Sequence, residues 1–186
     1  MDPRFTFVTM GIVKTHPPVK LICAITVAPG IDWDEVHNRL TRPFGPMDHL
    51  MDWYHFHHTA YYRDEMGEGL KKRMVSFQAL QMPDYLSEIK LATNYIERDF
   101  MEAGKRRVNL DPGYLTAAKL VLATTKDYSH RLYLGRGIFG DLHLRFEAGT
   151  FRPQPWTYPD YQEPFVLEFF NRVRETYLQQ LSEAAG

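Results

Sequence analysis

The chain has 186 residues, of which 44% are hydrophobic and 14% aromatic, and its formal net charge at pH 7 is -1. This length favours one domain with a full hydrophobic core, and the aromatic content excludes a disordered protein. A charge so close to neutral gives no reason to expect nucleic acid as a partner. The single cysteine, Cys23, excludes an internal disulfide and a cysteine zinc site, and its apolar neighbours predict a buried thiol.

The N-terminal segment has no signal-peptide pattern, and no apolar stretch approaches the roughly 20 residues of a spanning helix. We therefore expect a soluble, cytoplasmic protein with no membrane partner. Residues 1–18 end in Pro17–Pro18 and predict a loosely ordered lead-in. Residues 19–186 are predicted to form a single α+β domain.

The first part of this domain alternates strand and helix signals. Val19–Val27 is a nearly continuous apolar run, typical of a central strand. A helix capped by Asp32 or Asp34 is predicted to end near Arg42. The remaining predicted elements are a hairpin of Trp53–Tyr62 and Lys71–Leu80, a helix from Pro83–Asp84 to about Met101, and a short strand at Arg106–Leu110. The order β-α-β-β-α-β is the ferredoxin-like plan.

The second part is mostly strands, predicted at Lys119–Thr125, Arg131–Leu134 and Ile138–Phe146, before an amphipathic helix from about Glu163 to Ser182. The predicted fold class is therefore α+β: a ferredoxin-like βαββαβ core, a C-terminal β-rich extension and a final amphipathic helix.

Polar side chains flank the apolar stripe of the long helix. Lys90, Asn94 and Glu97 lie within about 60° of each other at 100° per residue. An ordinary surface ion pair explains them, and so does a ligand site in which Lys90 and Asn94 bind substrate and Glu97 acts as a carboxylate catalyst.

A second polar group, Asn109 and Asp111, stands where the short strand is predicted to end. Asp111–Pro112–Gly113 is a strong turn and helix-start signal, in which Asp111 caps the turn. Alternatively, a helix beginning at Pro112 would offer free N–H groups to a phosphate, with Asp111 catalytic and Asn109 binding substrate.

A third polar group is the turn from Lys126 to Arg131 between two predicted strands. His130 is the best general acid–base candidate in the chain, because an imidazole changes charge near neutral pH. Lys126 and Arg131 would bind an anionic substrate. The alternatives are solvated cations and a histidine that hydrogen-bonds to the backbone.

Other candidates are weaker. Glu65 at the hairpin tip is either a solvated turn residue or a further catalytic carboxylate. His55 and His57 share a strand face, a spacing that can hold a metal, but no third ligand lies near them in sequence, and packing explains them better. We predict no metal site. Trp156–Tyr161 either packs the last helix or forms an aromatic wall for a ring-shaped ligand.

The usual nucleotide-binding and hydrolase motifs are absent. No G-x-x-x-x-G-K-[ST] occurs, and Gly104–Lys105 is followed by Arg106. Gly135, Gly137 and Gly140 have the G-x-G-x-x-G spacing, but they lie between predicted strands and do not open a helix. A GTPase mechanism of the P-loop type therefore has no support.

A string of motifs in one order nevertheless resembles a known family. The motifs are Phe44–Gly45, Tyr61–Gly67, Ser76–Phe77, Ile89–Glu97, Val108–Leu115, Lys119–Asp127, His130–Leu134 and Trp156–Tyr161. They resemble an uncharacterised bacterial family, catalogued as domain of unknown function 4416, whose members are sometimes labelled GTP-binding proteins. The resemblance covers the chain from about Val19 to Tyr161 and implies no established activity.

Two classes of function remain. One is an enzyme that binds a nucleotide or phosphorylated small molecule in a polar cleft and performs acid–base chemistry on it. The other is a non-catalytic ligand- or protein-binding module. The sequence indicates no particular cofactor and no oligomeric state. For either class we expect the helix group to face Asn109, Asp111 and Lys126 across one concavity.

Overall fold

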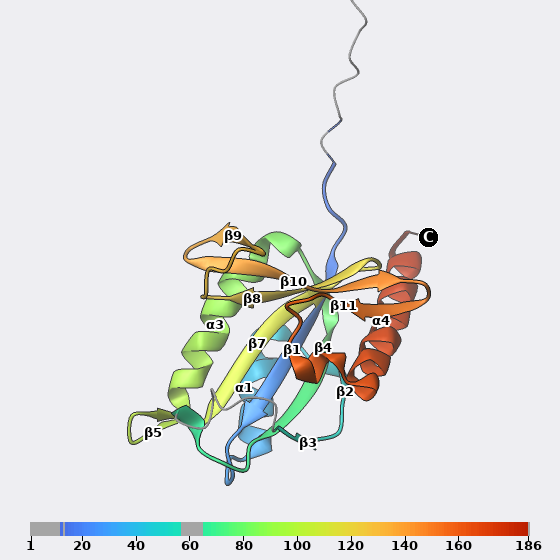
Figure 1. Ribbon diagram of the computed structural model, residues 1–186. Coiled ribbons are helices and arrows are strands. Elements are labelled where there is room, and N and C mark those ends of the chain that lie inside the picture. The colour runs from blue at the N-terminus through green and yellow to red at the C-terminus, as the bar shows by residue number, and fades with distance from the viewer. Residues whose placement is uncertain (1–11, 13, 57–64, 186) are drawn as a thin grey trace, which may run out of the picture.

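The computed structural model describes residues 12, 14–56 and 65–185 (Figure 1). Strand β1 (Val19–Val27) is buried along its whole length and lies at the centre of one large sheet. It pairs with β4 (Lys71–Gln81) on one side and with β7 (Val108–Leu115) on the other, and both pairings are antiparallel. Both faces of the sheet are covered at β1, which explains why this strand is nearly continuously apolar rather than alternating.

The strand order in the sheet is β11-β10-β8-β7-β1-β4-β2. The further strands are β2 (Met47–Leu50), β8 (Lys119–Thr124), β10 (Ile138–Glu147) and β11 (Thr150–Pro153), with β3 (Tyr54–His55) paired to β4 and β9 (Arg131–Gly135) paired to β10. The segment β7-β1-β4-β2 has the strand order of a ferredoxin-like βαββαβ core. The predicted α+β class and β-rich extension are confirmed.

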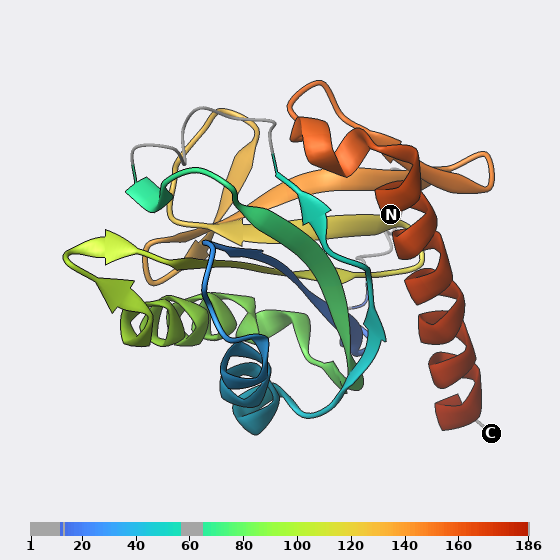
Figure 2. The same cartoon turned by 90° about the horizontal axis from the view of Figure 1, so that it is seen from below.

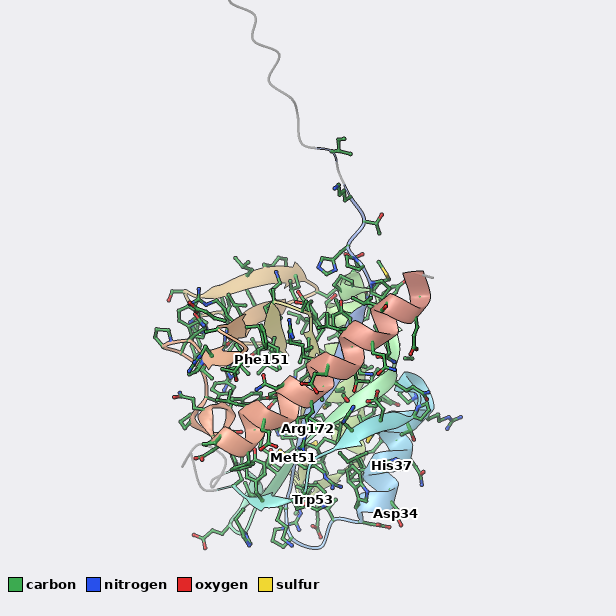
Figure 3. All side chains as sticks on the ribbon, turned by 90° about the vertical axis from the view of Figure 1, so that its right-hand side faces the viewer. Asp34, His37, Met51, Trp53, Phe151 and Arg172 are labelled. Carbon is green, nitrogen blue, oxygen red and sulfur yellow. The ribbon has the colours of Figure 1, made fainter. Side chains whose placement is uncertain are left out.

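Helices cover both faces of the sheet. Helices α1 (Trp33–Phe44) and α3 (Leu86–Asp99) lie together on one face, and α4 (Pro164–Ala185) crosses the other (Figure 2). Figure 3 looks onto α4, which passes over the sheet between Phe151 and Met51, two residues of the core that it covers. The smaller elements are the single turns η1 (Pro83–Tyr85) and η2 (Pro159–Gln162) and the hairpin of β5 (Met101–Glu102) and β6 (Lys105–Arg106).

Several boundaries differ from prediction. The long helix ends at Asp99 instead of near Met101, because β5 begins at the latter residue. The strand predicted at Trp53–Tyr62 is wrong in its described part, where only Tyr54–His55 is extended and β2 supplies the longer pairing to β4. Residues 57–64 of that prediction lie outside the described residues, as does most of the predicted lead-in.

The predicted turn and helix start at Asp111–Pro112–Gly113 is also wrong. Strand β7 runs through all three residues, with Pro112 opposite Cys23 of β1. Leu110 and Pro112 are two residues apart, so their backbone N and O atoms point to the same edge, away from β1. Proline has no N–H to donate there, and the pairing of β7 with β8 accordingly starts only at Gly113.

Beyond this point β7 and β8 diverge, as Figure 1 shows, with α3 beneath the gap. Gly113 permits the close approach at which the divergence begins. A Cβ atom there would lie 2.4 Å from the Val121 carbonyl oxygen and 2.8 Å from Leu122 Cδ2. The Asp-Pro-Gly sequence thus sets where two neighbouring strands separate.

We expect Gly113→Ala to reduce the free energy of unfolding by about 1–3 kcal/mol, because the added methyl group meets backbone that cannot move aside. Gly140→Ala is the matched control, since neither glycine has positive φ and the atoms nearest to a Gly140 Cβ would belong to the partly exposed Leu134 side chain, at 3.3 Å. The control should change stability by less than about 0.5 kcal/mol. Urea unfolding of both variants measures this, and equal costs would contradict the account.

Candidate functional site

A polar cleft of about 240 Å³ occupies the gap between β7 and the end of β8. Helix α3 contributes one wall, β7 and the end of β6 a second, and the end of β8 with the two residues after it a third, while Tyr158 closes one side. The lining residues are Lys90, Asn94, Glu97, Arg106, Asn109, Asp111, Thr124, Thr125, Lys126 and Tyr158. The helix group therefore does face Asn109, Asp111 and Lys126 across one concavity.

Two side chains of α3 complete the unpaired edge of β7. Glu97 Oε1 accepts a hydrogen bond from the Leu110 backbone N–H at 2.6 Å, and Lys90 Nζ donates to the Leu110 carbonyl at 2.7 Å. These are the backbone groups that β8 would have satisfied had it stayed paired. Because an unsatisfied buried backbone group costs about 1–3 kcal/mol, the two charged side chains stabilise the open edge.

Arg106 forms hydrogen bonds to two carboxylates and to one side-chain amide at the cleft. One terminal nitrogen donates to Glu97 Oε2 at 3.1 Å and to Asn109 Oδ1 at 2.8 Å, and the other donates to Glu65 Oε2 at 2.8 Å. Burial raises the pKa of Glu97, against the lowering effect of Lys90, the Leu110 N–H and Arg106. Both oxygens of Glu97 therefore already have fixed partners.

Asp111 is the carboxylate most open to the cleft, with 24% of its side chain exposed. Its Oδ1 lies 3.3 Å from Lys90 Nζ, and its Oδ2 accepts from Asn109 Nδ2 at 2.8 Å. Burial alone would raise the pKa of Asp111, but the charges of Lys90 and Lys72 outweigh it and hold the pKa below the usual value. Asp111 is thus ionised at neutral pH and able to accept a proton or a hydrogen bond.

A second hollow of about 410 Å³ adjoins the cleft and shares Asn94, Glu97 and Arg106 with it. Glu65 lines this second hollow, with 43% of its side chain exposed, and reaches the cleft only through Arg106. The predicted catalytic carboxylates are therefore linked in one network, but they do not all face one space.

The charged turn before β9 is built around a buried carboxylate. Asp141 Oδ2 accepts from Arg131 Nε at 2.9 Å and lies 3.3 Å from His130 Nε2. The Arg131 side chain is only 1% exposed and is not among the residues that line the cleft, so its expected role in binding an anionic substrate stays a prediction. Its two terminal nitrogens instead donate to the Lys126 carbonyl at 2.9 Å and to the Tyr158 hydroxyl at 3.0 Å, from behind the cleft wall.

His130 also lies outside the lining of the cleft. Its ring stacks on Trp156 with centroids 4.7 Å apart, and 17% of its side chain is exposed. The general acid–base role expected for His130 stays a prediction, and the structure places it beside Asp141 rather than beside Asp111.

A second histidine, which the sequence analysis did not single out, is fully buried. His143 Nδ1 lies 3.1 Å from Asp141 Oδ1, and its Nε2 accepts the Tyr158 backbone N–H at 3.1 Å. Because Nε2 is an acceptor, the neutral ring carries its proton on Nδ1 and donates it to Asp141. Burial lowers the pKa of His143 below its ordinary value, although Asp141 opposes this.

Sequence reasoning missed several residues that line the cleft or support its walls: Arg106, Thr124, Thr125, Asp141 and His143. It anticipated Tyr158 only as a member of the aromatic wall suggested for Trp156–Tyr161. The alternation of Asp141 and His143 with apolar residues in this strand was a usable signal, because residues two apart share a face. No comparable signal marked Arg106, because two of its partners, Glu97 and Glu65, lie in other segments of the chain.

No group of three or more potential metal-ligating side chains occurs among the described residues. His57 of the alternating histidine pair lies outside them. Of the aromatic segment Trp156–Tyr161, only Tyr158 lines the cleft, while Tyr161 packs in the core beneath α4. In the same described ranges, no helix combines the length and apolar character needed to cross a membrane.

The profile of one family, described as a domain of unknown function (DUF4416), matches residues 17–177. The chain belongs to this family. The match extends from the residues before β1 into α4, and so includes every residue that lines the cleft. Searches of curated proteins and of solved structures gave no significant match.

The neutral His143 predicts a pH dependence of stability. The pKa of His143 is lower in the folded chain than its unfolded value of about 6.5. Below pH 6.5 the unfolded chain therefore binds a proton that the folded chain does not, and the free energy of unfolding decreases as the pH is lowered. Wild type should lose up to about 1.4 kcal/mol per pH unit from this group below pH 6.5. His143→Gln should be less stable at pH 8 but lack this slope.

Urea unfolding between pH 5 and pH 8 measures the effect. Asp141, whose pKa is lowered, responds only near and below its unfolded pKa of about 3.9, so this range separates the two groups. Identical pH dependence in wild type and His143→Gln would contradict the assignment.

Proposed function

We propose that the cleft between α3, β7 and β8 binds an anionic small molecule, namely a nucleotide or a phosphorylated small molecule. The observation that carries the proposal is that the ammonium group of Lys90 has one more N–H donor than it has acceptors within the described chain. The Lys90 side chain is 7% exposed, and within the described chain its ammonium group donates to two acceptors, the Leu110 carbonyl and Asp111. An ammonium has three N–H donors, so one remains for a ligand in the cleft that Lys90 lines.

The charge balance of the lining supports the same class of ligand. Lys90, Arg106 and Lys126 are positive, and Glu97 and Asp111 are negative. The cleft therefore has a modest positive excess and also carries neutral donors, the amides and hydroxyls of Asn94, Thr124 and Thr125. A phosphate group with adjacent hydroxyls matches such a mixture better than a bare anion does.

Acid–base chemistry in this cleft would fall to Asp111. Its carboxylate is ionised and solvent-accessible, as a general base must be, whereas Glu97 is held on both oxygens. The second candidate function is a binding module without catalysis. It is favoured by the hydrogen bonds that hold both oxygens of Glu97, because a carboxylate with a structural role is not available for proton transfer. The two candidates share the same ligand and differ in whether Asp111 turns it over.

A thermal-shift screen with nucleotides, sugar phosphates and inorganic phosphate tests the proposal. A ligand at 100 times its dissociation constant should add about 2.7 kcal/mol and raise the melting temperature by roughly 5–10 °C. Lys90→Met should abolish the shift, measured against its own unliganded melting temperature. Lys119→Met is the matched control, since Lys119 is exposed on β8 and does not line the cleft.

Asp111→Asn separates catalysis from binding. It should retain the thermal shift and, if the site is an enzyme, eliminate product formation followed by phosphorus NMR. No shift with any compound, or equal loss in Lys119→Met and Lys90→Met, would sink the proposal.

A further inference from the structure

We propose that Tyr158 is a ligand-contacting residue, whose phenol donates its hydrogen to an anionic oxygen held in the cleft. This inference rests on the proposed function and narrows it, since it requires an oxygen acceptor of the ligand on the Tyr158 side. Tyr158 precedes η2 and is far in sequence from the other lining residues.

The hydrogen-bonding state of the phenol gives the direction of donation. The Tyr158 oxygen accepts a hydrogen bond from Arg131 at 3.0 Å. Within residues 14–56 and 65–185, no acceptor takes the phenol hydrogen, and the residue is 37% exposed. Arg131 therefore occupies one side of the oxygen, and the hydrogen is left for the space that Tyr158 lines.

The phenol stays protonated at neutral pH. Burial raises the pKa of Tyr158, and the nearby charge of Arg131 only partly opposes the rise. A protonated phenol in contact with an anion is a donor, and a hydrogen bond to a charged partner is stronger than one between neutral groups.

Arg131 holds the phenol in a fixed place. Its guanidinium is a rigid fork with three separate partners: Asp141, the Lys126 carbonyl and the Tyr158 hydroxyl. It also lies 4.4 Å from the centre of the Tyr128 ring. One buried cation thus positions two walls of the cleft, the segment of Lys126 and the ring of Tyr158.

The backbone of Tyr158 is fixed from the same network. Its N–H donates to His143 Nε2, and His143 is held by Asp141, the carboxylate that also binds Arg131. The backbone N–H and the phenol of Tyr158 are therefore both held by residues that bind Asp141, namely His143 and Arg131. Donors that are held in place before a ligand arrives bind anions without an ordering cost.

Isothermal titration of inorganic phosphate, pyrophosphate and ADP into the wild-type chain, Tyr158→Phe and Tyr128→Phe tests the inference. Tyr158→Phe removes only the hydroxyl, and we expect its affinity for the tightest-binding probe to fall roughly tenfold or more. Tyr128→Phe is the matched control, because Tyr128 packs on the same Arg131 guanidinium but does not line the cleft. Its affinity should stay within about twofold of wild type.

Arg131→Lys, alone and combined with Tyr158→Phe, tests the positioning role. The effect of Arg131 that runs through the phenol should disappear in the Tyr158→Phe background, so the double variant should lose less affinity than the two single losses combined. Full additivity would show that Arg131 acts without the phenol, through the Lys126 segment that it also holds, and would overturn its role in positioning Tyr158.

The outcomes separate this inference from the proposed function. Equal affinity of wild type and Tyr158→Phe overturns the inference and leaves the proposed function standing. Equal losses in Tyr158→Phe and Tyr128→Phe also overturn it, because the loss would then come from disturbing Arg131. Absence of binding of all three probes to wild type overturns both.

Discussion

The candidate site depends on the separation of β7 from β8 at Pro112. A strand edge left unpaired inside a protein requires other hydrogen-bonding partners, and here they come from α3, where Glu97 and Lys90 bind the N–H and C=O of Leu110. The ferredoxin-like core places α3 under this edge. The two charged side chains therefore have a structural role and, because they stand at the gap, also line the cleft.

A second buried charge network supports the opposite wall. Asp141 is nearly inaccessible and binds Arg131 and His143, and through them it fixes the Lys126 segment and Tyr158. Removing one partner of such a buried network typically costs about 3–5 kcal/mol, because a charge is then left without compensation. The cost of burying these charges is offset by their hydrogen bonds, and the result is a cleft whose walls are held on both sides by ionic contacts.

This arrangement distinguishes structural charges from those open to a ligand. Glu97, Arg106 and Arg131 are largely occupied by partners within the protein. Asp111 and the remaining N–H of Lys90 face the cleft, and the Tyr158 phenol borders it. The chemistry of the site therefore rests on a few exposed groups, which a larger set of buried ones keeps in position.

The periodicity of the sequence determined the fold class, because β1 carries a nearly continuous apolar run and α1, α3 and α4 carry apolar stripes at helical spacing. It also determined that Lys90, Asn94 and Glu97 share one edge of a helix. Tertiary structure alone decided that Asp111–Pro112–Gly113 is strand rather than turn, because its local signal was overridden by pairing with β1. It also decided that Arg131 and Asp141 are buried behind Tyr158, since the partners of a charge come from segments whose meeting no local pattern encodes.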